Sequence, residues 1–231
     1  MQIADKTRVD IKAMEVNYKN TKYTFQLGMG QGLTKGVAII GGISIVLYII
    51  SQANREALYP LFGFIPSYAI SKLRIWQFIT ANFMHGNLTH LIFNMFALYM
   101  FGCPVEKKVG QLDFIKYFLV CGIGGYGLAL ILWFIGITPN NLIVGASAGV
   151  YGLLLAFSLL YPNQKILLFF VIPMQAKWMA VIFGGLEFIL MFRNDGISHI
   201  GHLGGLLSGL LYILYQKGFT LRRNAAYAKR I

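Results

Sequence analysis

Six long apolar runs divide this chain, and they constrain its fold more than any other feature. The runs cover residues 36–53, 87–102, 113–136, 145–160, 177–192 and 198–216. A helix rises ~1.5 Å per residue, so about 20 residues cross the ~30 Å hydrocarbon core of a bilayer. The chain is 57% hydrophobic and only 12% charged, too few charged side chains for a water-soluble domain. We therefore predict an all-α polytopic membrane protein with six transmembrane helices.

The basic residues predict how these helices are oriented. The net charge is +12, and 16 of the 20 Lys and Arg residues fall in the two tails or in or directly beside the second and fourth connections between runs. Because positive residues favour the cytoplasmic side, we expect cytoplasmic tails at 1–35 and 217–231 around a membrane domain at 36–216. We place this multi-pass protein in a bacterial plasma membrane. The charge distribution indicates contact with anionic membrane lipid and not with nucleic acid.

Two connections have an unusual composition. Residues 54–86 mix aromatic side chains, Gly63 and two prolines with few charges, and we expect this first loop to lie in the outer lipid interface, where Trp76 is favourable. The apolar segment 166–174 is too short to span a bilayer. We interpret it as a partly buried connection, or as the beginning of the fifth helix.

Polar side chains occur near the start of the second, fourth and sixth runs. The second run contains His90 and Asn94, the fourth contains Ser147, and the sixth contains His199 and His202. With cytoplasmic termini, these three helices all run inward from the outer face, so their polar groups share a depth of ~5–10 Å. Such groups are costly inside a bilayer and indicate a functional site.

Small residues favour close approach of the fourth and sixth helices. Gly145 and Gly149 lie in the fourth run, and Gly205 and Gly209 lie in the sixth, at the spacing of helix-packing stripes. That approach would bring Ser147 within hydrogen-bond reach of an imidazole. A serine beside a base is the minimum requirement for nucleophilic acyl transfer, although a serine in a membrane helix more often bonds a carbonyl of its own helix.

The neighbouring polar groups suggest how an oxyanion would be stabilised. His90 and Asn94 are four residues apart and share a helix face, and they are candidate donors together with the backbone N–H of Ser147. Tyr151 lies four residues after Ser147, on the same face of the fourth helix.

Three segments resemble the motifs of rhomboid intramembrane serine proteases, in the right order and on the expected helices. They are HGNLTHLIFNMFALYMFG (85–102), GASAGVYG (145–152) and HLGGLLSG (202–209). The resemblance covers roughly residues 36–216 and implies a six-helix, rhomboid-like bundle. Glu106 also falls where the family often has an acid.

The resemblance implies a serine endopeptidase with a Ser–His dyad and no third carboxylate. Ser147 would be the nucleophile, and His202, which precedes the small-residue run, would be the general base. His90 and Asn94 would stabilise the oxyanion, and Tyr151 would orient the imidazole. The implied partners are single-span or other transmembrane substrates, cleaved in or near their membrane segments. No metal and no cofactor are implied, and the oligomeric state stays open.

Two positions depart from the family pattern. Ala148 follows the serine where many rhomboids have Gly, and its methyl group could crowd the oxyanion site. Gln77 follows Trp76 where a Trp-Arg pair is common, which suggests that a structural salt bridge is missing. Neither change removes a reacting group, so we expect activity.

The sequence also suggests the environments of three further polar residues and a segment that moves to admit the substrate. We expect His199 to lie nearer water, as a cap or hydrogen-bond partner, and His85 to be solvated or to stabilise a network. Glu187, inside the fifth run, should face the bundle, be hydrogen-bonded or be protonated. Movement of the fifth helix or of residues 193–198 is expected to control substrate entry.

Other functions fit the sequence less well. A catalytically inactive rhomboid-like scaffold that binds transmembrane clients would not need the serine, both histidines and the asparagine together. A zinc or iron site is disfavoured because we expect no Asp or Glu beside the histidines and find no HExxH pattern. A transporter is disfavoured because neither broken helices nor inverted halves are evident.

Overall fold

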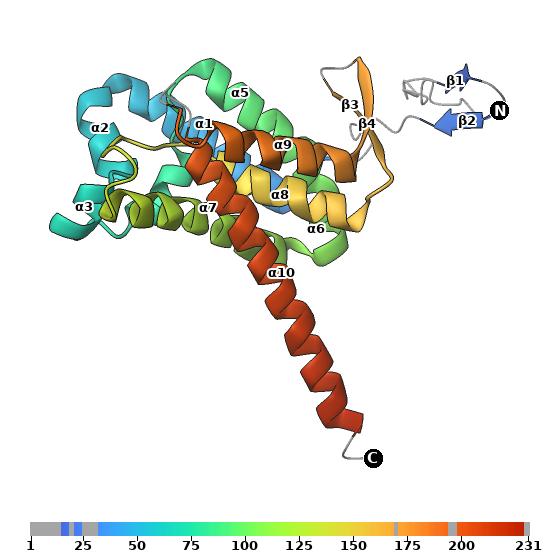
Figure 1. The fold of residues 1–231 in the computed structure, drawn as a ribbon. Coiled ribbons are helices and arrows are strands. Elements are labelled where there is room, and N and C mark those ends of the chain that lie inside the picture. The colour runs from blue at the N-terminus through green and yellow to red at the C-terminus, as the bar shows by residue number, and fades with distance from the viewer. Residues whose placement is uncertain (1–14, 19–20, 25–31, 169–170, 194–197, 229–231) are drawn as a thin grey trace, which may run out of the picture.

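The structure is a computed structural model that describes residues 15–18, 21–24, 32–168, 171–193 and 198–228. Most of this chain is helical (Figure 1). The principal helices are α1 (Lys35–Ala53), α5 (Leu88–Ala97), α6 (Cys103–Val109), α7 (Gln111–Phe134), α8 (Ser147–Leu160), α9 (Ala176–Leu190) and α10 (His199–Ala228). A π-helical turn, η3 (Leu98–Gly102), joins α5 to α6.

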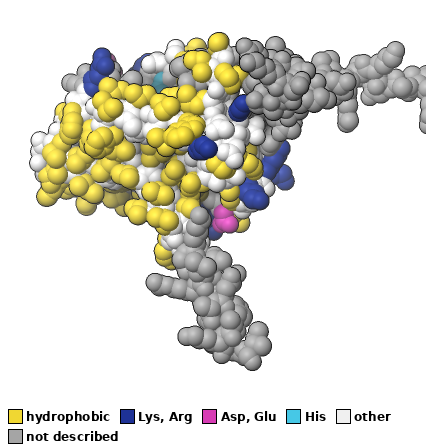
Figure 2. All heavy atoms as spheres, turned by 45° about the vertical axis from the view of Figure 1, so that its right-hand side comes forward, with side chains coloured by type: hydrophobic (Ala, Val, Ile, Leu, Met, Phe, Trp, Pro, Cys, Tyr) yellow, Lys and Arg dark blue, Asp and Glu magenta, His cyan; other side chains and the backbone are white. Residues whose placement is uncertain are grey.

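Three helical segments of the described chain are long and apolar enough to cross a membrane. They are Lys35–Ala53, Leu88–Val109 and Gln111–Phe134, and α8 is a shorter apolar helix of 14 residues. The mostly helical membrane fold therefore agrees with the sequence, whereas the six crossings remain a prediction. Figure 2 shows hydrophobic side chains covering much of one face of the helical body, with Lys and Arg mainly toward its margins.

Helices α7, α8 and α10 pack against one another and form the centre of the bundle. At Gly205 of α10 an added Cβ would lie 2.1 Å from the carbonyl oxygen of Ala148 in α8. The two backbones are therefore in direct contact. Gly149 and Gly209 instead face α7, where added Cβ atoms would lie 2.4 Å from Phe118 and 2.6 Å from the Tyr117 hydroxyl.

The expectation for Gly145 was wrong, because this residue is not part of a helix-packing stripe. It precedes α8 and has φ 128°, a backbone conformation that glycine adopts without the strain that a Cβ would cause. An added Cβ would also lie 2.7 Å from the His90 ring. Gly145 therefore shapes the turn that leads into α8.

The first loop folds into short helices that support this turn. They are α2 (Arg55–Phe62), α3 (Pro66–Ser71), α4 (Gln77–Thr80) and η2 (Ala81–Phe83). The backbones of Phe64 and Ile143 exchange hydrogen bonds of 2.9 and 2.8 Å, and the Gly145 N–H donates to the Ala81 carbonyl at 2.9 Å. The loop thus fixes the segment that precedes Ser147.

Gln77 holds the first loop together from inside. Its side chain is fully buried, its Nε2 donates to the Pro60 carbonyl at 2.8 Å, and its Oε1 accepts from the Ile65 N–H at 3.2 Å. The neutral amide of Gln77 therefore links Pro60 and Ile65 of the first loop. It does so at the position where the sequence suggested a missing salt bridge. Arg74 adds a second donor to the Pro60 carbonyl at 2.8 Å.

The described residues of the segment 166–174 belong to a partly buried connection between α8 and α9, as expected, and do not begin the fifth helix. They form most of an antiparallel hairpin of β3 (Lys165–Leu168) and β4 (Ile172–Gln175). In Figure 1 this hairpin lies at the end of the bundle opposite α2 and α3. A second hairpin, β1 (Glu15–Tyr18) and β2 (Thr21–Thr24), precedes α1.

Glu106 joins the beginning of α1 to α6. Its buried carboxylate accepts hydrogen bonds from the Thr34 hydroxyl at 2.5 Å and from the N–H groups of Gly36 and Val37 at 2.8 and 2.9 Å. A carboxylate at a helix N-terminus satisfies free N–H groups and interacts favourably with the helix dipole. The acid that follows the second apolar run is therefore a structural tie.

Candidate functional site

Ser147 is the first residue of α8. The turn before it is fixed by Gly145, whose carbonyl accepts from the Tyr126 hydroxyl at 3.0 Å. The first intrahelical bond of α8 runs from Val150 N–H to the Ala146 carbonyl. The N–H groups of the first helical turn therefore have no intrahelical acceptor, and the positive end of the helix dipole lies beside the serine hydroxyl.

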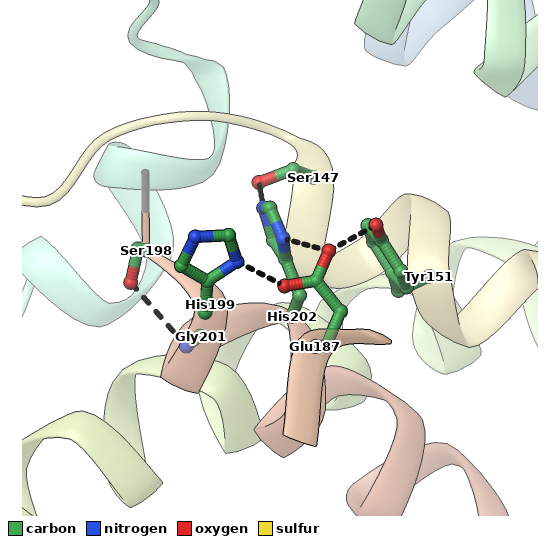
Figure 3. A network of polar contacts seen from close by, with 7 residues as sticks. All are labelled: Ser147, Tyr151, Glu187, Ser198, His199, Gly201 and His202. Carbon is green, nitrogen blue, oxygen red and sulfur yellow. Dashed lines mark hydrogen bonds and ion pairs between the residues drawn. The ribbon is translucent and has the colours of Figure 1, made fainter. Parts of the chain in front are cut away.

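His202, in the first turn of α10, meets this serine. Its Nε2 lies 2.8 Å from Ser147 Oγ, and its ring is buried (Figure 3). The Tyr151 ring stacks on the imidazole with centroids 4.5 Å apart and an interplanar angle of 12°. The structure thus brings together the three residues that the sequence analysis named as nucleophile, base and orienting ring.

A carboxylate lies beside this pair, contrary to the expectation of a dyad without one. Glu187 of α9 is buried, and its Oε1 lies 3.0 Å from His202 Nδ1. The two atoms are close, but their geometry is not that of an aligned hydrogen bond. The Tyr151 hydroxyl donates to the same oxygen.

His199 is also part of this cluster, as the expected hydrogen-bond partner, although it does not lie near water. It is buried, and its Nδ1 lies 2.6 Å from Glu187 Oε2. The sequence contained a signal for Glu187 that was not used. Glu187 lies within one turn of the end of α9, and His199 and His202 lie within one turn of the start of α10, so the three residues share one end of the bundle.

These three side chains are also a possible metal-binding group. Glu187, His199 and His202 each offer one ligand atom within 4.8 Å of the others, and carboxylate with imidazole is a ligand set that zinc accepts. An acid therefore does lie beside the histidines, contrary to expectation. The direct contacts of 2.6 and 3.0 Å mean that the carboxylate already interacts with both rings.

The two expected oxyanion donors are arranged differently from each other. A Cβ at Gly145 would lie 2.8 Å from His90 Nε2 and 3.6 Å from Ser147 Oγ, so His90 and the serine border the same small space. Asn94 is buried, and its Nδ2 donates to the His90 carbonyl one turn earlier in α5 at 2.9 Å. The described contacts of Asn94 therefore lie within its own helix.

His85 is a network residue and is not solvated. It is fully buried, its Nδ1 lies 3.2 Å from the Phe83 carbonyl, and its Nε2 lies 3.5 Å from the Ala146 N–H. A neutral ring with its proton on Nδ1 satisfies both contacts, since Nε2 then accepts. Burial, assisted by His90, lowers the pKa of His85 to about 4. His85 therefore supports the turn before the serine.

The Ala148 methyl group, which was expected to crowd the oxyanion site, packs against α7. An added Cβ at Gly125 of α7 would lie 2.6 Å from the Ala148 methyl group and 2.6 Å from the Gly201 carbonyl. The methyl group therefore fills the space between α7 and α10 that the missing side chain of Gly125 leaves open.

Comparisons with known proteins indicate the family of this chain. A family profile described as the Rhomboid domain matches residues 72–218. The chain is 27% identical over 207 residues to "Rhomboid-like protein 15" of Arabidopsis thaliana, covering 78% of this chain and 45% of that protein. It is 33% identical over 156 residues to "Rhomboid protein 1, mitochondrial" of Saccharomyces cerevisiae, covering 64% and 43%.

A relative named as a protease is also similar. The chain is 25% identical over 191 residues to "Rhomboid-like protease 3" of Toxoplasma gondii, covering 78% of this chain and 69% of that protein. The chain spans about half the length, or less, of the first curated relatives that it matches. The Rhomboid match contains both Ser147 and His202. Because it covers more than half of the chain, the chain belongs to the rhomboid family.

Proposed function

We propose that this chain is an intramembrane serine endopeptidase that cleaves transmembrane-anchored proteins in or near their membrane segments. The observation that supports it best is the distance of 2.8 Å between Ser147 Oγ and His202 Nε2. A serine in a membrane helix that merely bonded its own helix would not need a buried imidazole at this distance.

The chemistry would proceed in two steps. His202 Nε2 takes the proton from Ser147 Oγ as the oxygen attacks a substrate carbonyl carbon, and the C–O bond forms. The tetrahedral intermediate then collapses, the peptide C–N bond breaks, and the protonated imidazole gives its proton to the leaving amine. A water molecule, activated by the same Nε2, hydrolyses the resulting ester and restores the serine.

The developing oxyanion needs donors beside the serine. The proposed donors are the backbone N–H of Ser147 in the first turn of α8, His90, whose ring borders the same space, and Asn94. The Asn94 amide would have to use the N–H that is not bonded to the His90 carbonyl. Donors fixed in place before the reaction stabilise the transition state without reorganisation.

The proposed setting is a six-helix membrane domain of residues 36–216 with both tails in the cytoplasm and the first loop in the outer interface. A helix of 14 residues is about 21 Å long, shorter than the ~30 Å hydrocarbon core. Ser147 at its outer end would then lie below the membrane surface, in a site that water enters from outside. We place the domain in a bacterial plasma membrane, in contact with anionic lipid.

Labelling and cleavage test the proposal directly. The purified full chain is incubated with a serine-directed fluorophosphonate and with model single-span substrates. We expect labelling and cleavage by the unmodified protein and neither by Ser147→Ala. Ser158→Ala is the matched control, because Ser158 lies in the same helix and donates to the Leu155 carbonyl at 2.8 Å; it should retain both activities.

Two outcomes would contradict the proposal. An unmodified protein that is folded, binds transmembrane segments and neither labels nor cleaves would be the inactive scaffold that the sequence left open. Cleavage that survives Ser147→Ala but stops on addition of a chelator would indicate metal chemistry.

Full labelling of His202→Ala together with none of His199→Ala would transfer the role of base to His199.

A further inference from the structure

The Glu187 carboxylate is the centre of the polar cluster around the serine. Its Oε2 lies 2.6 Å from His199 Nδ1, and its Oε1 lies 3.0 Å from His202 Nδ1 and accepts from the Tyr151 hydroxyl (Figure 3). Glu187 is contributed by α9, whereas its partners come from α8 and α10. Both oxygens are therefore directed at groups of the candidate site.

The donors around Glu187 indicate whether its carboxyl group is ionised or protonated. A carboxylate accepts through two oxygens and has no proton to donate. One hydroxyl and two ring nitrogens surround Glu187, and each of them can supply a proton. A protonated carboxyl group would instead have to donate to one of these neighbours and would lose an acceptor position. The ionised form therefore fits the contacts best.

A carboxylate at His202 Nδ1 has a defined chemical effect on the opposite nitrogen. The base must present Nε2 without a proton to the serine, so the neutral ring must carry its proton on Nδ1. A negative charge 3.0 Å from Nδ1 favours that tautomer and stabilises the imidazolium that forms during attack. Stacking by Tyr151 orients the ring plane but supplies no charge.

We propose that Glu187 is a positioning residue that completes a Ser147–His202–Glu187 triad, with His199 and Tyr151 holding its carboxylate in place. This inference rests on the proposed function and deepens it, because it assigns a role that a Ser–His dyad leaves empty. This role gives a function to a buried acid, which is a costly residue inside a membrane domain.

The test compares Glu187→Gln with the unmodified protein in the same labelling and cleavage assays. We expect kcat to fall roughly 10²–10⁴-fold while KM changes by less than about threefold, because Gln keeps the shape but loses the charge. Glu187→Asp should recover part of the loss. Tyr151→Phe, which keeps the stack and removes one donor to Glu187, should reduce kcat less than Glu187→Gln does.

The pH profile separates positioning from a merely structural role. The groups around His202 that titrate or carry charge are Glu187 from α9, Tyr151 from α8, His90 from α5 and His199 on α10 itself. Without the negative charge the imidazolium is less stable, so the acidic limb of the rate profile should move to lower pH in Glu187→Gln. It should not move in the control Glu106→Gln, which alters the buried carboxylate at α1.

Each failure can be recognised. If Glu187→Gln reacts at the unmodified rate with an unchanged pH profile while Ser147→Ala is inert, the triad is wrong and the dyad stands. If Glu187→Gln does not fold, Tyr151→Phe and Glu187→Asp decide, and unmodified kcat in both would overturn the triad. If a chelator abolishes labelling, the cluster is a metal site. If the unmodified protein never labels, the proposed function and the triad fail together.

Discussion

His85 shows how a residue outside the reacting pair controls the site. Its neutral ring accepts from the N–H of Ala146, the residue directly before Ser147, and its own carbonyl accepts from the Tyr59 hydroxyl at 2.5 Å. The first loop and the turn before the serine therefore meet at one buried histidine. Because the ring is fully buried, protonation would put a charge where no water solvates it.

The stability of the fold should therefore depend on the protonation of His85. Its pKa in the folded chain is about 4, against about 6.5 in an unfolded chain. The lowered pKa makes its contribution complete above pH 6.5, and this contribution is lost as the pH falls from 6.5 to 4, by about 3 kcal/mol. Thermal unfolding in detergent, measured between pH 7 and pH 4.5, should show this decline.

His85→Gln is the matched variant for this prediction. A Gln side chain carries an acceptor and a donor but does not titrate in this range. We expect its unfolding temperature to depend less steeply on pH than that of the unmodified protein. Equal slopes would mean that groups other than His85 cause the decline.

At the scale of elements, the contact between α8 and α10 sets the distance between serine and imidazole. A Cβ at Gly205 would lie 2.1 Å from the Ala148 carbonyl oxygen, and backbone cannot rotate away as a side chain can. Gly205→Ala should therefore separate the helices, and a displacement of ~1 Å near reacting atoms lowers rates by about 10². The rate of fluorophosphonate labelling measures this loss.

Gly127→Ala provides the control for helix packing. Gly127 lies in α7, and an added Cβ there would meet no atom within 4 Å. This variant should label at the unmodified rate, and its helix should be slightly more stable because Ala has the higher helix propensity. A Gly205→Ala protein that labels as fast as Gly127→Ala would show that α8 and α10 do not position the site.

The helices could be predicted from the sequence more reliably than their ends or their partners. Apolar runs predict helices because a bilayer requires continuous apolar length. The second run nevertheless continues helically to Val109, since Pro104 lies in the first turn of α6, where it is tolerated. The segment 166–174 is the expected connection, but its strands were not predicted, because a short apolar run fits a strand as well as a helix.

The candidate site was predictable in part for the same reason. Ser147, His90 and His202 stand out because polar residues are rare in apolar runs. The contact of Glu187 with His202 depends on how α9 is rotated about its axis, and a helix that is apolar nearly all round does not define that rotation. The cost of an acid in a membrane predicted that Glu187 would face the bundle, whereas its particular partners could not be predicted.

At the scale of the whole molecule, the distribution of basic residues predicts alternating exposure of the connections. Single cysteines at Lys72 and Pro139 should react with an impermeant maleimide in intact cells. Cysteines at Lys108 and Asn163 should react only after permeabilisation. All four positions are exposed in the structure, and the native Cys103 and Cys121 are buried. The reverse pattern would invert the proposed topology, and uniform labelling would contradict the six crossings.

Helix α9 buries little apart from Ala176, Met179 and the Glu187 carboxylate. The carboxylate proposed to position His202 is therefore carried by a helix with few buried residues. An outward tilt of α9 would move this carboxylate away from the imidazole. Such a protease would have little activity while α9 is tilted outward and the site is accessible to other membrane proteins. It would become reactive only when a bound substrate segment allows α9 to return to its position against the bundle. Transmembrane helices that contact the protein without fitting the site would then not be cleaved.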